Sequence, residues 1–578
     1  MKILGIHDGH NASVCLMEDG KIKYVIQEER VTKIKNKGGF PYKSLDLLFK
    51  ITGLTPNDID YVALNGNYMP MVGKDITREL ILKSYEDLLN PFGTARLRNF
   101  LKTFKFIDSF IQKQNKKIRL NILKNLGFKK EKVIFVEHHL AHASCAYFGM
   151  GKFKEPILVL TNDGAGDRLC ATVNIGEKGN IRRIASVHEH HSIGNLYAIF
   201  TYLLGMVPLE HEYKIMGMAP YVKSSKAREV ADKFWEMFEF EENGLTWKFK
   251  KGFSVFGAMP YFKEFIFLKR FDYLMAGLQI FIEEFLVKWV KNAIKRTGIR
   301  KIALAGGTFM NVKANKAIME LPEVEELFVF PSCGDEANAI GVCYYLESQI
   351  NGTKNLKPLE DIYFGIEWSN DEIKKRFEKY NFKNYKYKIV KYSNIEKKVA
   401  ELLSSGEIVA RFKGREEFGA RALGNRSLLA NASKSGVIKE INEMIKNRDF
   451  WMPFASSILD EDMDKYIKDW NIYKKKNKPY YMIMTFDTKE KAHKDLVAGI
   501  HPYDKTVRPQ MVVERHNKDY YKLISEFKNL TGIGGILNTS LNLHGYPLVH
   551  TPEDAFHLID NSSLKYLAIG DYLIEKIT

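Results

Sequence analysis

Short apolar and β-branched segments alternate with helical patterns over the first 330 residues, and this alternation restricts the fold more than any other feature. The first three predicted strands form a meander, because Asp19-Gly20 is a hairpin signal between the second and the third. The predicted strands cover residues 2–6, 13–17, 21–26, 61–64, 133–136, 157–161, 301–304 and 327–330. Alternation of this kind predicts an α/β domain.

A second domain is predicted after a short linker. Residues 351–357 are rich in Asn, Gly and Lys and precede Pro358. Such composition is typical of a linker. We therefore predict domains at 1–355 and 359–578. Strands of the second domain are expected at residues 407–412, 480–485 and 535–537, and no repeat of fixed period is visible.

Composition excludes several classes of protein. No apolar run reaches the roughly 18–20 residues of a membrane span, and the chain starts directly with a strand pattern. We expect a cytoplasmic protein without a membrane partner. The five cysteines are scattered without zinc-like spacing, which indicates reduced core residues.

The net charge of +17 is concentrated in one segment, residues 96–132, with twelve Lys or Arg against two acids. Apolar residues at helical spacing run through its first half, at Phe100, Phe104, Ile107 and Ile111. A solvated helical face is favoured about two to one over an anion-binding surface.

A pair of histidines indicates a metal site. His138 and His142 are four residues apart, so both would project from one face of a helix. Asp163 and Asp335 each lie in a glycine-marked loop after another predicted strand. Two histidines with one carboxylate suit a divalent metal with open positions. Such a pair alone is more often structural, but the converging acids favour the metal.

Glycine-rich loops indicate phosphate binding in the first domain. The loops at 163–166 and 305–308 each follow a predicted strand, and together they resemble the nucleotide cleft of the actin, sugar-kinase and heat-shock ATPase superfamily. The second domain carries basic and amide residues in glycine-interrupted loops, which favour an anion site over a surface patch.

These motifs together resemble the O-carbamoyltransferases of nodulation-factor and antibiotic biosynthesis, typified by the tobramycin carbamoyltransferase. The resemblance spans nearly the whole chain. Its carriers are HNAS at 10–13, EER at 28–30, Lys35, Gly39-Phe40-Pro41, HHLAHA at 138–143, EYKIMGMAP at 212–220, GGTFMN at 306–311, GD at 334–335, GREEFGARALGNRS at 414–427 and LNTSLN at 537–542.

The resemblance implies an ATPase-superfamily-like domain, similar to the tRNA threonylcarbamoyl transferase, followed by a YrdC-like α/β domain. The YrdC-like domain would make carbamoyl-adenylate from carbamoyl phosphate and ATP, and the first domain would transfer the carbamoyl group to a hydroxyl. His138, His142 and Asp335 would hold the metal, with Asp163 as a ligand or beside one. Iron is the expected metal, with manganese, magnesium and zinc as alternatives.

The resemblance also assigns roles to other residues. His10 would be the base, with His7 as a competitor, and Lys35 would stabilise developing negative charge. ATP and carbamoyl phosphate would bind, in the first domain, to Asp163, Gly164, Gly166, Lys214, Gly306, Gly307 and Asn311. In the second domain they would bind to Arg411, Lys413, Arg421, Asn425, Arg426, Ser427, Arg448, Arg508, Asn538 and Asn542.

The family motifs do not fix the acceptor. We expect a small-molecule or nucleotide hydroxyl, and the basic segment 96–132 also suits a hydroxymethylated base in DNA. We interpret residues 69–132 as an acceptor-facing lid, and a homodimer is compatible with the sequence. Two alternatives stay open: a tRNA threonylcarbamoylation enzyme and a nucleotide-gated binding protein without group transfer. Ala420 replaces the usual proline of the family motif, which loosens a turn.

Overall fold

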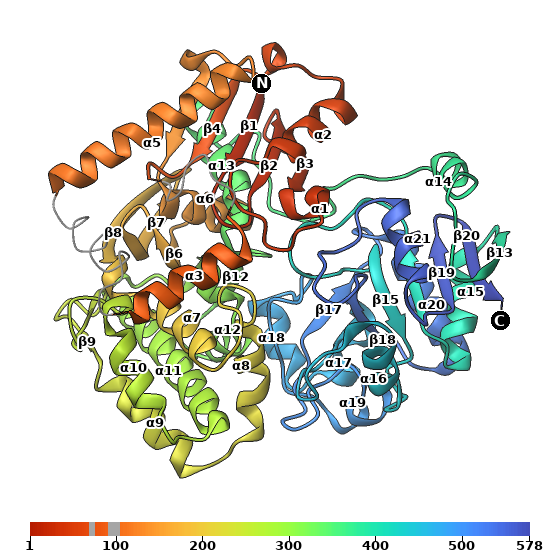
Figure 1. Ribbon diagram of the computed structural model, residues 1–578. Helices are drawn as coiled ribbons and strands as arrows, with labels where there is room; N and C mark the ends of the chain where they lie inside the picture. The colour runs from red at the N-terminus through yellow and green to blue at the C-terminus, as the bar shows by residue number, and fades with distance from the viewer. Residues whose placement is uncertain (69–75, 91–104, 578) are drawn as a thin grey trace. The chain divides into compact units, whose positions relative to one another are not determined.

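The computed structural model describes the backbone of residues 1–68, 76–90 and 105–577 (Figure 1) and excludes the side chains of 105–108. Arg96, Arg98, Phe100, Phe104 and most of the predicted lid's first half therefore lie outside the described residues. Two compact units are present. Unit 1 comprises Met1–Thr32 and Asn36–Leu359, and unit 2 comprises Lys33–Lys35 and Glu360–Thr578. Among the described helices, none has both the length and the apolar character needed to cross a membrane.

Unit 1 contains two five-stranded sheets with the same topology. The first has the order β3-β2-β1-β4-β5 and the second the order β8-β7-β6-β11-β12. In each sheet the first three strands along the chain pair antiparallel, and the two later strands add in parallel. Unit 1 is therefore built from two structurally equivalent halves, a repeat that the sequence did not reveal. The strands are β1 (Lys2–His7), β2 (Ser13–Glu18), β3 (Lys21–Gln27), β4 (Tyr61–Asn65), β5 (Val133–Val136), β6 (Ile157–Gly166), β7 (Leu169–Glu177), β8 (Asn180–His188), β11 (Lys301–Ala305) and β12 (Glu326–Val329).

Two helices join the halves of unit 1. Helix α6 (His138–Met150) follows β5, and α13 (Asn338–Asn351) follows β12 after one 3-10 turn. Helix α13 packs on β1 and β4, α6 packs on β6 and β11, and the two helices contact each other. This packing places the start of both helices near the carboxyl ends of the central strands, where ligands bind in α/β folds.

Other helices and a small hairpin complete unit 1. A large aromatic cluster, including Trp247, Phe281 and Trp289, fills the core between α11 and the hairpin. The remaining elements are α1 (Glu28–Thr32), α2 (Tyr42–Thr52), α3 (Arg78–Leu89), α5 (Lys105–Asn125), α7 (Ile193–Leu203), α8 (Glu212–Met218), α9 (Ser225–Trp235), α10 (Met259–Ile266), α11 (Phe271–Thr297), α12 (Val312–Met319), β9 (Phe238–Phe240) and β10 (Trp247–Phe249).

Unit 2 is built on one eight-stranded mixed sheet with the order β13-β20-β19-β14-β15-β18-β16-β17. Helices α15 and α20 pack on each other, and Leu403, Phe527 and Ile536 are fully buried in the core beneath them. The strands are β13 (Lys386–Lys391), β14 (Val409–Phe412), β15 (Arg426–Ala430), β16 (Ala455–Leu459), β17 (Pro509–Val512), β18 (Gly535–Ser540), β19 (Tyr566–Ile569) and β20 (Tyr572–Ile577). The helices are α14 (Asn370–Phe377), α15 (Ile395–Ser405), α16 (Val437–Ile441), α17 (Met463–Tyr466), α18 (Trp470–Lys476), α19 (Glu490–Asp495), α20 (Lys518–Thr531) and α21 (Pro552–Asp560).

The structure confirms the predicted α/β class, and it corrects one strand. Each predicted strand of the first domain is present, and the hairpin of β2 and β3 turns at Asp19 and Gly20, with φ of 48° and 74° as a tight primed turn requires. The strand predicted at 480–485 is wrong. Met482 has a φ of 57°, which interrupts an extended backbone, and the apolar side chains are buried in an irregular segment.

Candidate functional site

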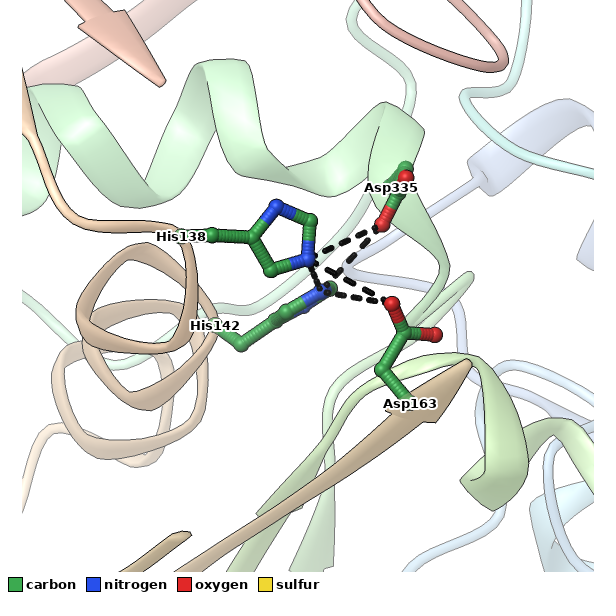
Figure 2. A group of neighbouring side chains, drawn as sticks. All are labelled: His138, His142, Asp163 and Asp335. Carbon is green, nitrogen blue, oxygen red and sulfur yellow. Dashed lines mark hydrogen bonds and ion pairs between the residues drawn. The ribbon is translucent and has the colours of Figure 1, made fainter. Parts of the chain in front are cut away.

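Four side chains of unit 1 converge on one point (Figure 2). They are His138 and His142 from α6, Asp163 from the irregular end of β6, and Asp335 from the turn before α13. One ligand atom from each lies within 4.8 Å of the others. The sequence predicted three of them as ligands and placed Asp163 at or next to the metal, and the structure brings all four together.

Local structure explains why these side chains meet. Helix α6 starts directly after β5, where Glu137 caps it by accepting hydrogen bonds from the backbone N–H groups of His139 and Leu140. The two histidines therefore lie one turn apart on one face. Gly307 N donates to Asp163 Oδ1 at 3.0 Å, so the other oxygen of that carboxylate faces the histidines. A side chain at position 307 would contact the same oxygen.

The donor set fits a divalent cation. Each histidine Nε2 lies 3.4 Å from Asp335 Oδ1, the two Nε2 atoms are 3.1 Å apart, and Asp163 Oδ2 is 3.4 Å from His138 and 3.9 Å from His142. Bonds of about 2.1 Å would place neighbouring ligand atoms about 3.0–3.4 Å apart in octahedral or tetrahedral geometry. Two imidazoles and two carboxylates are ligands for iron, manganese or zinc.

The electrostatics of the centre also favour a cation. Burial lowers the pKa of His138, but the carboxylates of Asp335 and Asp163 raise it to about 9. Burial raises the pKa of Asp335, but His138 and a hydrogen bond from His142 hold it below its ordinary value. The two acids thus carry negative charge in a half-buried position, where a bound cation would be stabilised.

Polar residues missed in the sequence surround the centre. Asn65, at the end of β4, places Nδ2 at 2.9 Å from His7 Nδ1 and 3.3 Å from His138 Nδ1. Asn338, at the start of α13, contacts His142 Nε2 at 3.2 Å. An asparagine after an apolar strand is too common to indicate this role from sequence. Gly166 leaves room for the His138 ring, because a Cβ there would lie 2.1 Å from it.

His10 lies in the loop after β1, and its side chain is partly buried. Burial lowers its pKa, although Asp335 and Asp163 act in the opposite direction, so the ring is neutral at pH 7. Its Nδ1 is buried and makes no hydrogen bond with any described residue. His7 Nε2 instead donates to the His10 carbonyl at 2.8 Å, and its Nδ1 faces Asn65. His7 therefore holds the loop that carries His10, and Nδ1 of His10 has no hydrogen-bond partner among the described residues.

The remaining predicted residues of unit 1 occupy two places. Gly164 and Gly306 flank Asp163, and Gly306 has a φ of 106° with its Cα against the Asn162 backbone. Asn311 caps α12 and exchanges hydrogen bonds with Gln279, and Lys214 lies on α8. Nucleotide binding by these residues stays a prediction.

Unit 2 contains a cluster of cations around a buried lysine. Lys446 ends a π-helical turn after α16 and donates to the carbonyl of Ser540 and to Asn542 Oδ1 at 2.7 Å. Burial lowers its pKa well below the ordinary value, and Arg448 and Lys35 lower it further. Burial, Arg421 and Arg448 act likewise on Arg508. Because guanidinium groups keep their protons, this cluster favours an anion.

Other predicted residues of unit 2 hold the loop that precedes the cluster. Arg411 donates to the Gly424 carbonyl, and Arg426 donates to the carbonyls of Gly414 and Ile366. Glu417, missed in the sequence, accepts hydrogen bonds from the backbone of residues 423, 425 and 426. Further contacts are made by Asn425 to the Arg415 carbonyl, Ser427 to the Gly424 amide, Asn538 to the Ala422 carbonyl and Asn542 to Lys446.

Two predicted cations lie in places that the sequence did not indicate. Lys413 forms ion pairs with Glu396, Asp519 and Asp571, and these carboxylates neutralise its charge. Lys35 belongs to unit 2, although the chain before and after it belongs to unit 1. Its charge lowers the pKa of Lys446 in the same unit. The predicted action of Lys35 in carbamoyl transfer stays a prediction.

The fold and sites define a two-unit α/β protein with a candidate metal centre in one unit and a candidate anion site in the other. Comparison with known families gives the class directly. The family described as Carbamoyltransferase N-terminus matches residues 2–344, and the one described as Carbamoyltransferase C-terminus matches residues 400–576. The chain belongs to the carbamoyltransferase family and is an enzyme of that class, as the sequence motifs indicated.

Relatives of known sequence extend over the whole chain. An uncharacterized protein of Methanocaldococcus jannaschii is 30% identical over 586 residues, covering 100% of both chains. Nodulation protein NolNO of Sinorhizobium fredii is 26% identical and covers 98% of this chain and 79% of its own. Among solved structures, component A of the Acidaminococcus fermentans (R)-2-hydroxyglutaryl-CoA dehydratase covers 60% of this chain and 99% of its own, with 13% identity and a TM-score of 0.30. That score does not establish a shared fold.

Proposed function

We propose that the protein is an ATP-dependent O-carbamoyltransferase that makes carbamoyl-adenylate in unit 2 and transfers its carbamoyl group to a hydroxyl acceptor in unit 1. The observation that carries the proposal is the presence of two chemically different sites. One is a centre of two buried histidines and two half-buried aspartates beside the neutral His10, and the other is the cation cluster around Lys446. A two-step reaction through an anionic intermediate uses both.

The first step would take place at the cation cluster. Water cleaves carbamoyl phosphate to carbamate and phosphate, and a carbamate oxygen then attacks the α-phosphorus of ATP. A new P–O bond forms, the bond to the β-phosphate breaks, and pyrophosphate leaves. Lys446, Arg448 and Arg508 would neutralise the charge of the phosphate groups, which is the main requirement of phosphoryl and nucleotidyl transfer.

The second step would take place at the His and Asp centre. The acceptor oxygen attacks the carbamoyl carbon, the bond to the adenylate oxygen breaks, and AMP leaves. Neutral His10 takes the proton of the acceptor hydroxyl at its ring nitrogen. A divalent metal bound by His138, His142, Asp163 and Asp335 would supply Lewis-acid polarisation.

Features of the fold support the assignment of carbamoyl transfer to unit 1 and of adenylate formation to unit 2. The duplicated sheet topology of unit 1 supports an ATPase-superfamily-like domain. We further propose that unit 2 is YrdC-like, since an adenylate-forming partner is what the transfer site needs. The acceptor is proposed to be a sugar or nucleotide hydroxyl. Exposed Lys113, Lys117 and Lys124 on α5 support an anionic acceptor.

The test is pyrophosphate release from the full chain with ATP and Mn²⁺, with and without carbamoyl phosphate and with no acceptor added. We expect release that requires carbamoyl phosphate. Release without it would indicate a different acyl donor or plain ATP hydrolysis. If folded, metal-loaded protein binds ATP and releases no pyrophosphate under either condition, the proposal is wrong.

A further inference from the structure

One arginine of the basic helix α5 is completely enclosed by protein. Arg119 is 0% exposed, whereas Lys113, Lys117 and Lys124 on the same helix are exposed. Among residues 109–125 of this helix, whose side chains are described, only Leu123, one turn further on, is also buried. The basic composition of this segment therefore conceals a residue with a different role from its neighbours.

Arg119 makes four hydrogen bonds, and all of them end on two loops. Nε and Nη2 donate to Asp8 Oδ2 and Oδ1, each at 2.7 Å. Nη1 and Nη2 donate to the carbonyls of Gly66 and Asn65, each at 2.6 Å. A fork-shaped guanidinium can satisfy this set, whereas a lysine ammonium cannot hold both carboxylate oxygens in the same geometry.

Both loops carry residues of the transfer site. Asp8 lies between His7, the last residue of β1, and His10 in the following loop. Asn65 ends β4, and its side-chain amide lies between His7 and the metal-ligand candidate His138. Arg119 therefore joins the ends of two neighbouring parallel strands at the edge where the site is built.

We infer that Arg119 is a positioning residue for carbamoyl transfer. It fixes Asp8 and the Asn65 backbone, and so it sets the place of His10 and the orientation of the His138 ring. A buried ion pair is poor evidence of stability, because apolar residues of similar size often serve the fold equally well. Preorganisation of the site is a better reason for this pair. The inference rests on the proposed function of unit 1.

The test uses the full chain and Co²⁺ as a probe of the His and Asp centre. Binding is followed by the visible absorption of Co²⁺, and pyrophosphate release is measured in parallel. The variants are Arg119→Lys, which keeps the charge but loses the fork, and Asp8→Asn, which keeps the shape. Leu123→Ala, on the same helix, destabilises the core at an apolar side chain that forms no hydrogen bond with either loop. Lys117→Gln is the control for charge.

We expect R119K and D8N to weaken Co²⁺ binding about 10- to 100-fold and to change its spectrum, as loss of groups around metal ligands does. Pyrophosphate release should be unchanged, because it belongs to unit 2. L123A should lower the unfolding midpoint and K117Q should leave it unchanged, and both should bind Co²⁺ like the wild type.

Wild-type Co²⁺ affinity and spectrum in folded R119K and D8N would overturn the inference. So would an equal loss of affinity in L123A, since the effect would then be general destabilisation. If R119K does not fold, D8N decides alone. Failure of the wild type to release pyrophosphate would instead count against the proposed function, and it would leave the Co²⁺ comparison intact.

Discussion

Replacement of Lys446 by methionine separates anion binding from stability in unit 2. The lysine is 2% exposed and donates to Ser540 and Asn542, and no ion pair compensates its charge within the described contacts. A charge-assisted hydrogen bond to a phosphate oxygen contributes about 1.5–3 kcal/mol. Since 1.4 kcal/mol is tenfold, K446M should bind pyrophosphate about 10- to 150-fold more weakly.

The effect on the ligand-free protein should be small, because two changes oppose each other. Removing a buried charge is favourable, as the lowered pKa of Lys446 indicates, but the acceptors of Ser540 and Asn542 lose their donor at about 1–3 kcal/mol each. We therefore expect the unfolding midpoint without ligand to move by only a few degrees, roughly what 1–2 kcal/mol produces in a domain of this size.

The assay is thermal unfolding in a pyrophosphate titration, with carbamoyl-phosphate-dependent pyrophosphate release measured on the same samples. Lys439→Met is the matched control, because Lys439 lies on the preceding helix and its side chain is 82% exposed. The wild type and K439M should be stabilised by the same pyrophosphate concentrations, and K446M should need about 10- to 150-fold more for the same stabilisation. Equal stabilisation of all three would refute an anion site at Lys446.

Three further predictions concern unit 1. His10→Asn should slow carbamoyl transfer about 10²–10⁴-fold while pyrophosphate release continues, measured with an acceptor found by screening sugars and nucleotides; equal loss of both would contradict the division of steps. His142→Gln should lower Co²⁺ affinity about 100-fold in an absorption titration, and unchanged affinity would argue against the centre. Burial raises the pKa of Glu212 to about 7, so wild-type stability should fall as pH rises from about 4.5 to 7. Glu212→Gln should remove that fall and be about 3 kcal/mol more stable than the wild type at pH 8, because each unit of pKa shift corresponds to about 1.4 kcal/mol. Identical urea unfolding at pH 5 and 8 in both proteins would contradict this expectation.

Most strand positions and the approach of His138 to His142 were predictable because their signals are local. Alternation and the Asp19-Gly20 turn define the hairpin of β2 and β3, and a helical spacing of four aligns His138 with His142. The prediction of a strand at 480–485 was wrong because an apolar run indicates burial but does not fix the backbone conformation. The positive φ of Met482 depends on its surroundings in the fold.

Features that depend on long-range contacts were not predictable. Arg119 lies in a segment whose basic composition is typical of a solvated helix. Its burial depends on Asp8, which is 111 residues away in the sequence. The membership of Lys35 in unit 2 has no local signal either. The roles of Arg411 and Arg426 show the converse, since basic residues in a glycine loop can serve the loop's own carbonyls.

The duplicated topology of unit 1 brings equivalent segments of its two halves to the candidate metal centre. Strands β1 and β6 are equivalent, and they lead to His10 and Asp163; helices α6 and α13 are equivalent, and they begin beside His138 and Asp335. Each half supplies what the other lacks, so neither half alone could assemble the centre. A small rotation between the halves would change the distances between the histidines and the aspartates first, so the affinity of the candidate centre for a cation would depend on how closely the two halves pack.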